Sequence, residues 1–122
     1  MYPYSSSMQE NKTDQQATQA ESTMKKQAAI TVIKAICALF SVDVPTVWFA
    51  DDVVRDDTCG EYGYEVGEVR LFSGWTLNTA AHEALHHVQY QTDWDRATFE
   101  TAHGSQFQAI RNKARRNGIK VK

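Results

Sequence analysis

The chain has 122 residues, of which 42% are hydrophobic, 23% charged and 11% aromatic, and its formal net charge is −2 at pH 7. This composition indicates one globular domain, and a chain of this length can fold without a disulfide lattice or a structural metal. No apolar run reaches the roughly 18 residues that cross a bilayer, and the polar N-terminus lacks the features of a secretory signal. We therefore expect a soluble, cytoplasmic protein with no membrane partner, in which Cys37 and Cys59 are reduced thiols.

Residues 1–23 form a polar N-terminal segment. They are rich in Gln, Ser and Thr and contain only scattered Met and Tyr, so they cannot offset the entropy that is lost on ordering. The sequence predicts a disordered arm here, or at most a frayed helical lead-in. A single domain is expected over residues 24–122.

An amphipathic helix is predicted over Ala29–Phe40. Its large apolar residues fill one half of the helical wheel, and Thr31, Lys34, Ala35 and Ala38 occupy the other half. The helix is therefore expected to bury one wide face.

Short strands are predicted in the middle of the chain. Thr46–Ala50 is rich in β-branched and aromatic residues. Tyr62–Val66 alternates with period two, and the alternation breaks just before Val69–Phe72, so a hairpin or bulge is expected to join two antiparallel strands. From about Leu77 the pattern is helical, with one break between residues 93 and 100. The order predicts an α+β fold in which two helices follow the strands.

One motif carries chemistry. His82, Glu83 and His86 form HExxH, which on a helix places two imidazoles one turn apart, where both can reach one zinc ion. Glu83 then lies beside the metal as a base for its water. His87 lies about 100° from His86 around the helix. It is expected to point towards solvent and to be a poor ligand.

A catalytic zinc usually takes three protein ligands, so a third must come from elsewhere in the chain. His103 is the strongest candidate, because it shares one helical stripe with Phe107, Ile110 and Ala114, and this stripe is expected to pack inward. The alternative is a histidine that only helps to cap the start of the last helix. Further carboxylate ligands remain open: Asp93, Asp95 and Glu100.

These motifs resemble the SprT-like (Spartan-type) zinc metallopeptidases. The resemblance rests on HEALH at residues 82–86, on the segment His103–Phe107, which is similar to that family's HGxxF, and on the strand GEVRLF upstream of the HExxH helix. It covers about residues 69–116 and lacks the C-terminal four-cysteine zinc ribbon of many relatives. It implies a zincin-like core with a three-stranded antiparallel sheet, one zinc ion on His82, His86 and His103, and Glu83 as the general base.

As an enzyme, such a chain would hydrolyse peptide bonds in a protein or peptide substrate. Tyr62, Tyr64 or Tyr90 can assist as a hydrogen-bond donor to the reacting carbonyl, although ordinary half-buried aromatic residues would look the same. The strand Val69–Phe72 is a candidate edge for pairing with an extended substrate. The alternative function is a catalytically silent, zinc-stabilised module that binds nucleic acid or protein.

The last twelve residues hold six of the thirteen Lys and Arg residues and no acid. Basic residues near a helix C-terminus favour the helix dipole, which is the simpler interpretation. The alternative is a nucleic-acid contact through Arg111, Arg115 and Arg116.

Overall fold

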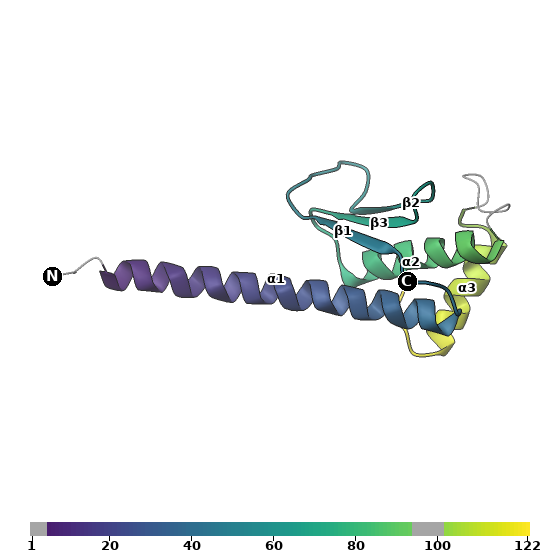
Figure 1. Cartoon of the computed structure of the whole chain (residues 1–122), viewed down its shortest axis with the longest axis horizontal. Coiled ribbons are helices and arrows are strands. Elements are labelled where there is room, and N and C mark those ends of the chain that lie inside the picture. The colour runs from purple at the N-terminus through teal and green to yellow at the C-terminus, as the bar shows by residue number, and fades with distance from the viewer. Residues whose placement is uncertain (1–4, 94–101) are drawn as a thin grey trace.

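The computed structural model describes residues 5–93 and 102–122. Its elements follow the order α1 (Ser5–Leu39), β1 (Thr46–Ala50), β2 (Gly60–Gly63), β3 (Glu68–Phe72), α2 (Leu77–Asp93) and α3 (Ser105–Arg116). The α+β class is confirmed. The strands form one layer, α1 and α2 run along one side of it, and α3 packs against α2 (Figure 1). None of the described helices is both long enough and apolar enough to span a membrane.

The sheet is mixed, and the expectation of an antiparallel sheet is wrong for β1. The strand order is β1-β3-β2, with β1 parallel to β3 and β2 antiparallel to β3. The reason lies in the connection at residues 51–59, which carries the chain across the sheet so that β3 later returns between the first two strands. The β2–β3 hairpin itself is confirmed, but the predicted strand over Tyr62–Val66 is wrong in its bounds, because β2 ends at Gly63 and residues 64–67 form the turn. The turn ends at Gly67, whose φ of 64° favours glycine.

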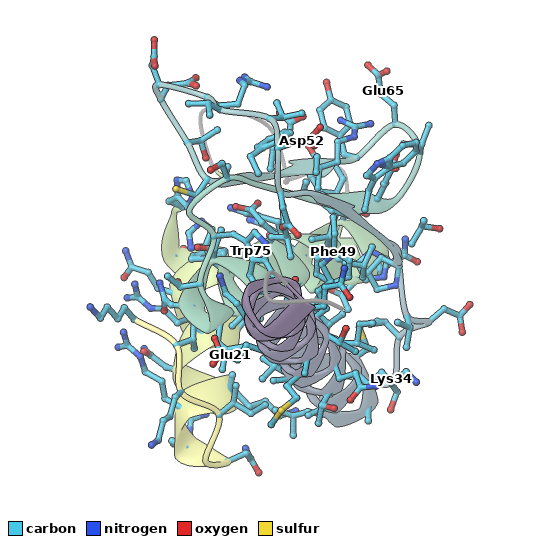
Figure 2. All side chains as sticks on the ribbon, turned by 90° about the vertical axis from the view of Figure 1, so that its left-hand side faces the viewer. Glu21, Lys34, Phe49, Asp52, Glu65 and Trp75 are labelled. Carbon is cyan, nitrogen blue, oxygen red and sulfur yellow. The ribbon has the colours of Figure 1, made fainter. Side chains whose placement is uncertain are left out.

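The core lies between α1, α2 and the sheet. On α1 the predicted apolar face is buried through Ala29, Ile33 and Ile36, and all four residues predicted for the opposite half of the wheel are exposed. Figure 2 shows one of them, Lys34, projecting from the helix. Large, fully buried apolar side chains from the other elements are Val69 and Leu71 of β3, Leu85 and Val88 of α2, and Phe107 of α3.

Helix α1 begins at Ser5, inside the segment for which the sequence predicts disorder. Its first half extends away from the rest of the molecule (Figure 1), and every side chain from residue 19 to 25 is exposed. Residues 19–25 are therefore helical, but their side chains are not buried against the rest of the molecule. The division into an arm and a domain stays a prediction.

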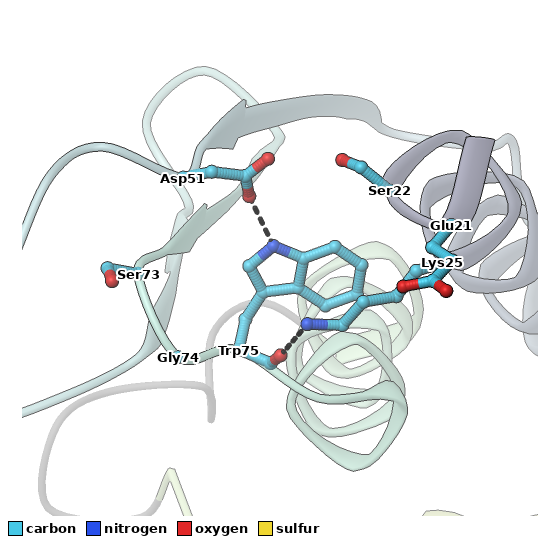
Figure 3. Close-up of a pocket in the computed structure, with 7 residues that line it drawn as sticks. All are labelled: Glu21, Ser22, Lys25, Asp51, Ser73, Gly74 and Trp75. Carbon is cyan, nitrogen blue, oxygen red and sulfur yellow. Dashed lines mark hydrogen bonds between the residues drawn. The ribbon is translucent and has the colours of Figure 1, made fainter. Parts of the chain in front are cut away.

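Lys25 and Lys26 join α1 to residues that flank the sheet. Lys25 Nζ donates to the Trp75 carbonyl oxygen over 2.6 Å, and the Trp75 indole N–H donates to Asp51 over 2.5 Å (Figure 3). Lys26 pairs with the same carboxylate at 3.1 Å. Burial acts to raise the pKa of Asp51, but the Trp75 and Lys26 hydrogen bonds hold it below its ordinary value. Glu21 and Ser22 line the shallow hollow of about 340 Å³ beside this contact.

Candidate metal centre

Helix α2 sets the positions of the HExxH residues. Its start is capped reciprocally, because the Thr79 N–H donates to Thr76 Oγ1 and the Thr76 N–H donates to Thr79 Oγ1. Its apolar residues Ala84 and Leu85 are fully buried in the core. This packing fixes the rotation of the helix about its axis.

His82, His86 and His103 converge on one point. Their Nε2 atoms lie 3.2 Å apart for His82 and His103, 3.2 Å for His82 and His86, and 3.0 Å for His86 and His103. Each neutral imidazole Nε2 offers either one N–H or one lone pair in the ring plane, so these three atoms cannot all satisfy one another by hydrogen bonds. A cation between them satisfies all three at once.

The triangle has the size that a metal requires. A tetrahedral zinc ion with Zn–N bonds of about 2.0–2.1 Å holds its nitrogen ligands about 3.3–3.4 Å apart. The observed separations of 3.0–3.2 Å are close to this value. The three histidines can therefore hold a metal ion.

The tautomer of His86 is set by a neighbour on its own helix. His86 Nδ1–H donates to Gln89 Oε1 over 3.1 Å, which leaves the Nε2 lone pair directed at the centre of the triangle. Gln89 is fully buried and its amide Nε2 donates to Gln106 of α3. Sequence reasoning missed this role of Gln89, although its position three residues after His86, on the same helix face, was a usable signal.

Burial keeps the helix imidazoles uncharged. It lowers the pKa of His86 to about 4, with smaller contributions from His82 and His103. Burial also lowers the pKa of His82, assisted by His103 and by the guanidinium of Arg111. Neutral imidazole is the form that binds metal.

His103 lies in the turn before α3, two residues ahead of the helix start at Ser105, and is exposed. The predicted inward stripe of α3 is present, since Phe107, Ile110 and Ala114 are buried. Phe107 packs against all three imidazoles, stacking on His86 at a centroid distance of 4.6 Å. Phe107 is therefore the apolar support on which the three rings rest.

The expectation that His87 faces solvent is wrong. Its side chain is only 3% exposed, and its Nε2–H donates to the Asp43 carbonyl oxygen over 2.7 Å. Its Nδ1 then accepts a hydrogen bond from the Tyr62 hydroxyl over 2.9 Å. His87 does not join the metal triangle because both its nitrogens are engaged in joining α2 to β2 and to the residues that precede β1.

Glu83 lies beside the triangle without belonging to it. The side chain is 8% exposed, and burial, assisted by the charge of Glu61, raises its pKa to about 7. Glu83 and the three histidines line the same cavity of about 500 Å³. A carboxyl group is thus available next to any water that a metal would hold.

The opposite wall of this cavity is β2. Gly60, Glu61 and Tyr62 line it, and β2 is an edge strand whose second side pairs with no other strand in the part of the chain that the structure describes. The expectation that Val69–Phe72 offers an edge is wrong, because β3 is the central strand and is paired on both sides. The edge that faces the metal centre belongs to β2.

The three tyrosines also line this cavity, but they differ in what they can do. The Tyr62 hydroxyl proton is used by His87, so Tyr62 is not free to donate to a ligand. Tyr64 and Tyr90 stack on each other with centroids 5.0 Å apart and an interplanar angle of 4°. Burial raises the pKa of Tyr90, so its hydroxyl keeps its proton near neutral pH.

The structure does not test the alternative carboxylate ligands. Asp95 and Glu100 lie outside the described residues, and only the backbone of Asp93 is described.

The three C-terminal arginines have different surroundings. The Nε of Arg111 is buried and has no hydrogen-bond partner among the described residues, and the Nε of Arg115 donates to the Val121 carbonyl oxygen over 2.6 Å. Arg116 is exposed in the last turn of α3, where it favours the helix dipole. Nucleic-acid binding by these residues stays a prediction.

Comparison with known proteins returned no relatives. No protein-family model matches the chain, and no curated protein or solved structure is detectably similar to it. The resemblance to SprT-like peptidases therefore rests on the motifs themselves.

Proposed function

We propose that this protein is a zinc-dependent metallopeptidase. The observation that carries the proposal is the convergence of three imidazole Nε2 atoms within 3.2 Å of one another, with the Glu83 carboxyl in the same cavity. A structural zinc site closes its coordination sphere with four protein ligands, whereas a catalytic site uses three and keeps one position for water. Three histidines and a nearby carboxyl group fit the second pattern.

Zinc is the metal that the donor set favours. Three neutral imidazoles at tetrahedral spacing suit zinc, and hard cations such as calcium and magnesium require oxygen ligands instead. We expect one zinc ion per chain, held by His82, His86 and His103. A partly open cavity on the side of β2 leaves room for water and substrate.

In this proposal Glu83 transfers the proton and Gln89 orients a metal ligand. When bound, zinc lowers the pKa of a water molecule and polarises the carbonyl of the scissile bond. The Glu83 carboxylate takes a proton from the attacking water and passes it to the leaving amine nitrogen. Gln89 holds the imidazole of His86 in the ligating tautomer.

The free edge of β2 supports a peptide as the substrate. An extended peptide can add to an exposed sheet edge through main-chain hydrogen bonds, which are independent of its sequence. Such pairing along Gly60–Gly63 would pass the substrate backbone in front of the metal centre. The edge strand and the HExxH helix on two sides of one cleft support the zincin-like, SprT-like assignment.

The decisive experiment compares the wild type with Glu83→Gln. Both proteins are loaded with zinc, their metal content is measured, and their hydrolysis of an unfolded protein is followed. We expect equal zinc content and at least about a 10²-fold slower hydrolysis by the variant, because the amide cannot act as the base.

Equal behaviour of the two proteins at full zinc loading would reject the peptidase. The zinc-stabilised binding module would then be the better description of the chain.

A further inference from the structure

We infer that Tyr64 and Tyr90 form a subsite that selects an aromatic side chain of the substrate close to the scissile bond. The inference rests on the proposed peptidase function and deepens it by naming a class of peptide. It starts from the stacked pair of rings at one end of the metal cleft.

The pair stands between two hollows. Tyr62, Tyr64 and Tyr90 line the metal cavity, and the same three residues line a second hollow of about 510 Å³. Tyr90 packs against Tyr62 at 5.6 Å as well as against Tyr64 at 5.0 Å, so three rings form a continuous aromatic wall. Tyr64 is nevertheless 48% exposed, which leaves ring surface for a ligand.

The wall is close to the metal centre because of helix geometry. Tyr90 follows His82 and His86 at the same four-residue spacing, so all three side chains lie on one stripe of α2. Four residues of helix rise about 6 Å. This equals the length of about two residues of an extended chain, so the subsite receives a side chain within about two positions of the scissile bond.

An aromatic ring fits this wall better than the alternatives do. Offset stacking and edge-to-face contacts favour one aromatic ring on another beyond the area that is buried. The nearby charged groups disfavour acidic residues and nucleic acid, because Arg55 is paired with Asp57 and Glu61, whereas Glu65 forms no ion pair among the described residues. Glu65 points outward from the β2–β3 turn at the rim of the second hollow, where it would repel a phosphate (Figure 2).

The test measures binding without requiring turnover. Four labelled decapeptides of Ala, Gly and Ser, with Phe, Lys, Glu or Ala at the centre, are titrated against zinc-loaded Glu83→Gln protein by fluorescence anisotropy. We expect the Phe peptide to bind about tenfold more tightly than the Ala peptide, because a buried aromatic ring contributes both area and stacking.

Variants in the same background locate the subsite. Tyr64→Leu should remove most of the preference for Phe, and Tyr64→Phe should keep it. Trp48→Leu is the matched control, because Trp48 is also exposed but lies on β1 at the opposite edge of the sheet. Thermal unfolding of each variant shows whether the fold is retained.

Two results would overturn the inference: equal binding of the Phe and Ala peptides, or tightest binding of the Lys peptide. To tell failure of the subsite from failure of the peptidase proposal, the zinc-loaded wild type is incubated with the Phe peptide and hydrolysis is measured. If the protein prefers Phe but hydrolyses nothing, the aromatic subsite is supported and the peptidase proposal is rejected. If the protein is active, we expect mass spectrometry of the products to place Phe within two residues of the cut.

Discussion

The neighbouring residues His86 and His87 act in different parts of the molecule. His86 directs Nε2 into the metal triangle, whereas His87 uses both nitrogens to join α2 to Tyr62 and to the Asp43 carbonyl. The helical wheel separates the two residues by about 100° but does not show that α2 is enclosed on several sides. The prediction for His87 failed because α2 packs against α1 as well as against β2 and β3.

The pair provides a matched test of the ligand assignment. His82→Ala, His86→Ala and His103→Ala should each remove most of the bound zinc, because two imidazoles hold the ion far more weakly than three. His87→Ala should retain one zinc ion per chain, measured by elemental analysis after dialysis against a weak chelator.

His87→Ala is also expected to lower the free energy of unfolding, because it removes the hydrogen bonds of His87 with the Tyr62 hydroxyl and with the Asp43 carbonyl oxygen. A full equivalent of tightly bound zinc in His103→Ala would show that the third ligand is another residue.

Gln89 can be tested by its effect on metal affinity. Gln89→Leu keeps the volume of the side chain but removes the acceptor for His86 Nδ1–H, so zinc affinity should fall by about 10- to 100-fold. The control is Gln108→Leu, an exposed glutamine on α3. Zinc dissociation constants from chelator competition provide the measurement, and equal affinities would show that Gln89 serves the core rather than the ligand.

At the scale of elements, the sequence predicts local structure better than strand order. The wheel of residues 29–40 identifies the buried face of α1, because that face is set by helix periodicity alone. The parallel pairing of β1 with β3 depends on where the connection at residues 51–59 leads the chain, and no residue pattern within the strands records this. For this reason the sequence predicts the free sheet edge on β3, whereas the structure has β3 in the centre of the sheet.

Helix α1 offers a prediction about the extended first segment. Removing residues 1–20 should leave zinc content and cooperative unfolding unchanged, because the contacts of Lys25 and Lys26 with the body remain and the side chains at residues 19 and 20 are exposed. Circular dichroism should show a smaller helical signal with an unchanged midpoint of unfolding. A large drop in the midpoint would show that the segment packs as part of the fold.

At the scale of the whole molecule, the charges are unevenly distributed along the chain. The acidic connection at residues 51–57 contributes Arg55 and Asp57 to the lining of the cleft, and six of the thirteen Lys and Arg residues lie in α3 and the C-terminal tail. Of the three predicted arginines, Arg115 also holds the tail through the Val121 carbonyl. The basic segment therefore has a structural role whether or not it binds a polyanion.

Nucleic-acid binding can be separated from that structural role by choosing Arg116, which is exposed at the end of α3. If the basic terminus contacts phosphates, Arg116→Gln should weaken binding of a DNA duplex and lower the slope of log affinity against log salt by about one, whatever the DNA sequence. Lys34→Gln on the exposed face of α1 is the control and should change neither quantity. Replacing Arg111, Arg115 and Arg116 together should have a larger effect, read alongside the unfolding midpoint because Arg115 anchors the tail. Absence of DNA and RNA binding by the wild type at low salt would leave the helix dipole and the tail contact as the roles of these arginines.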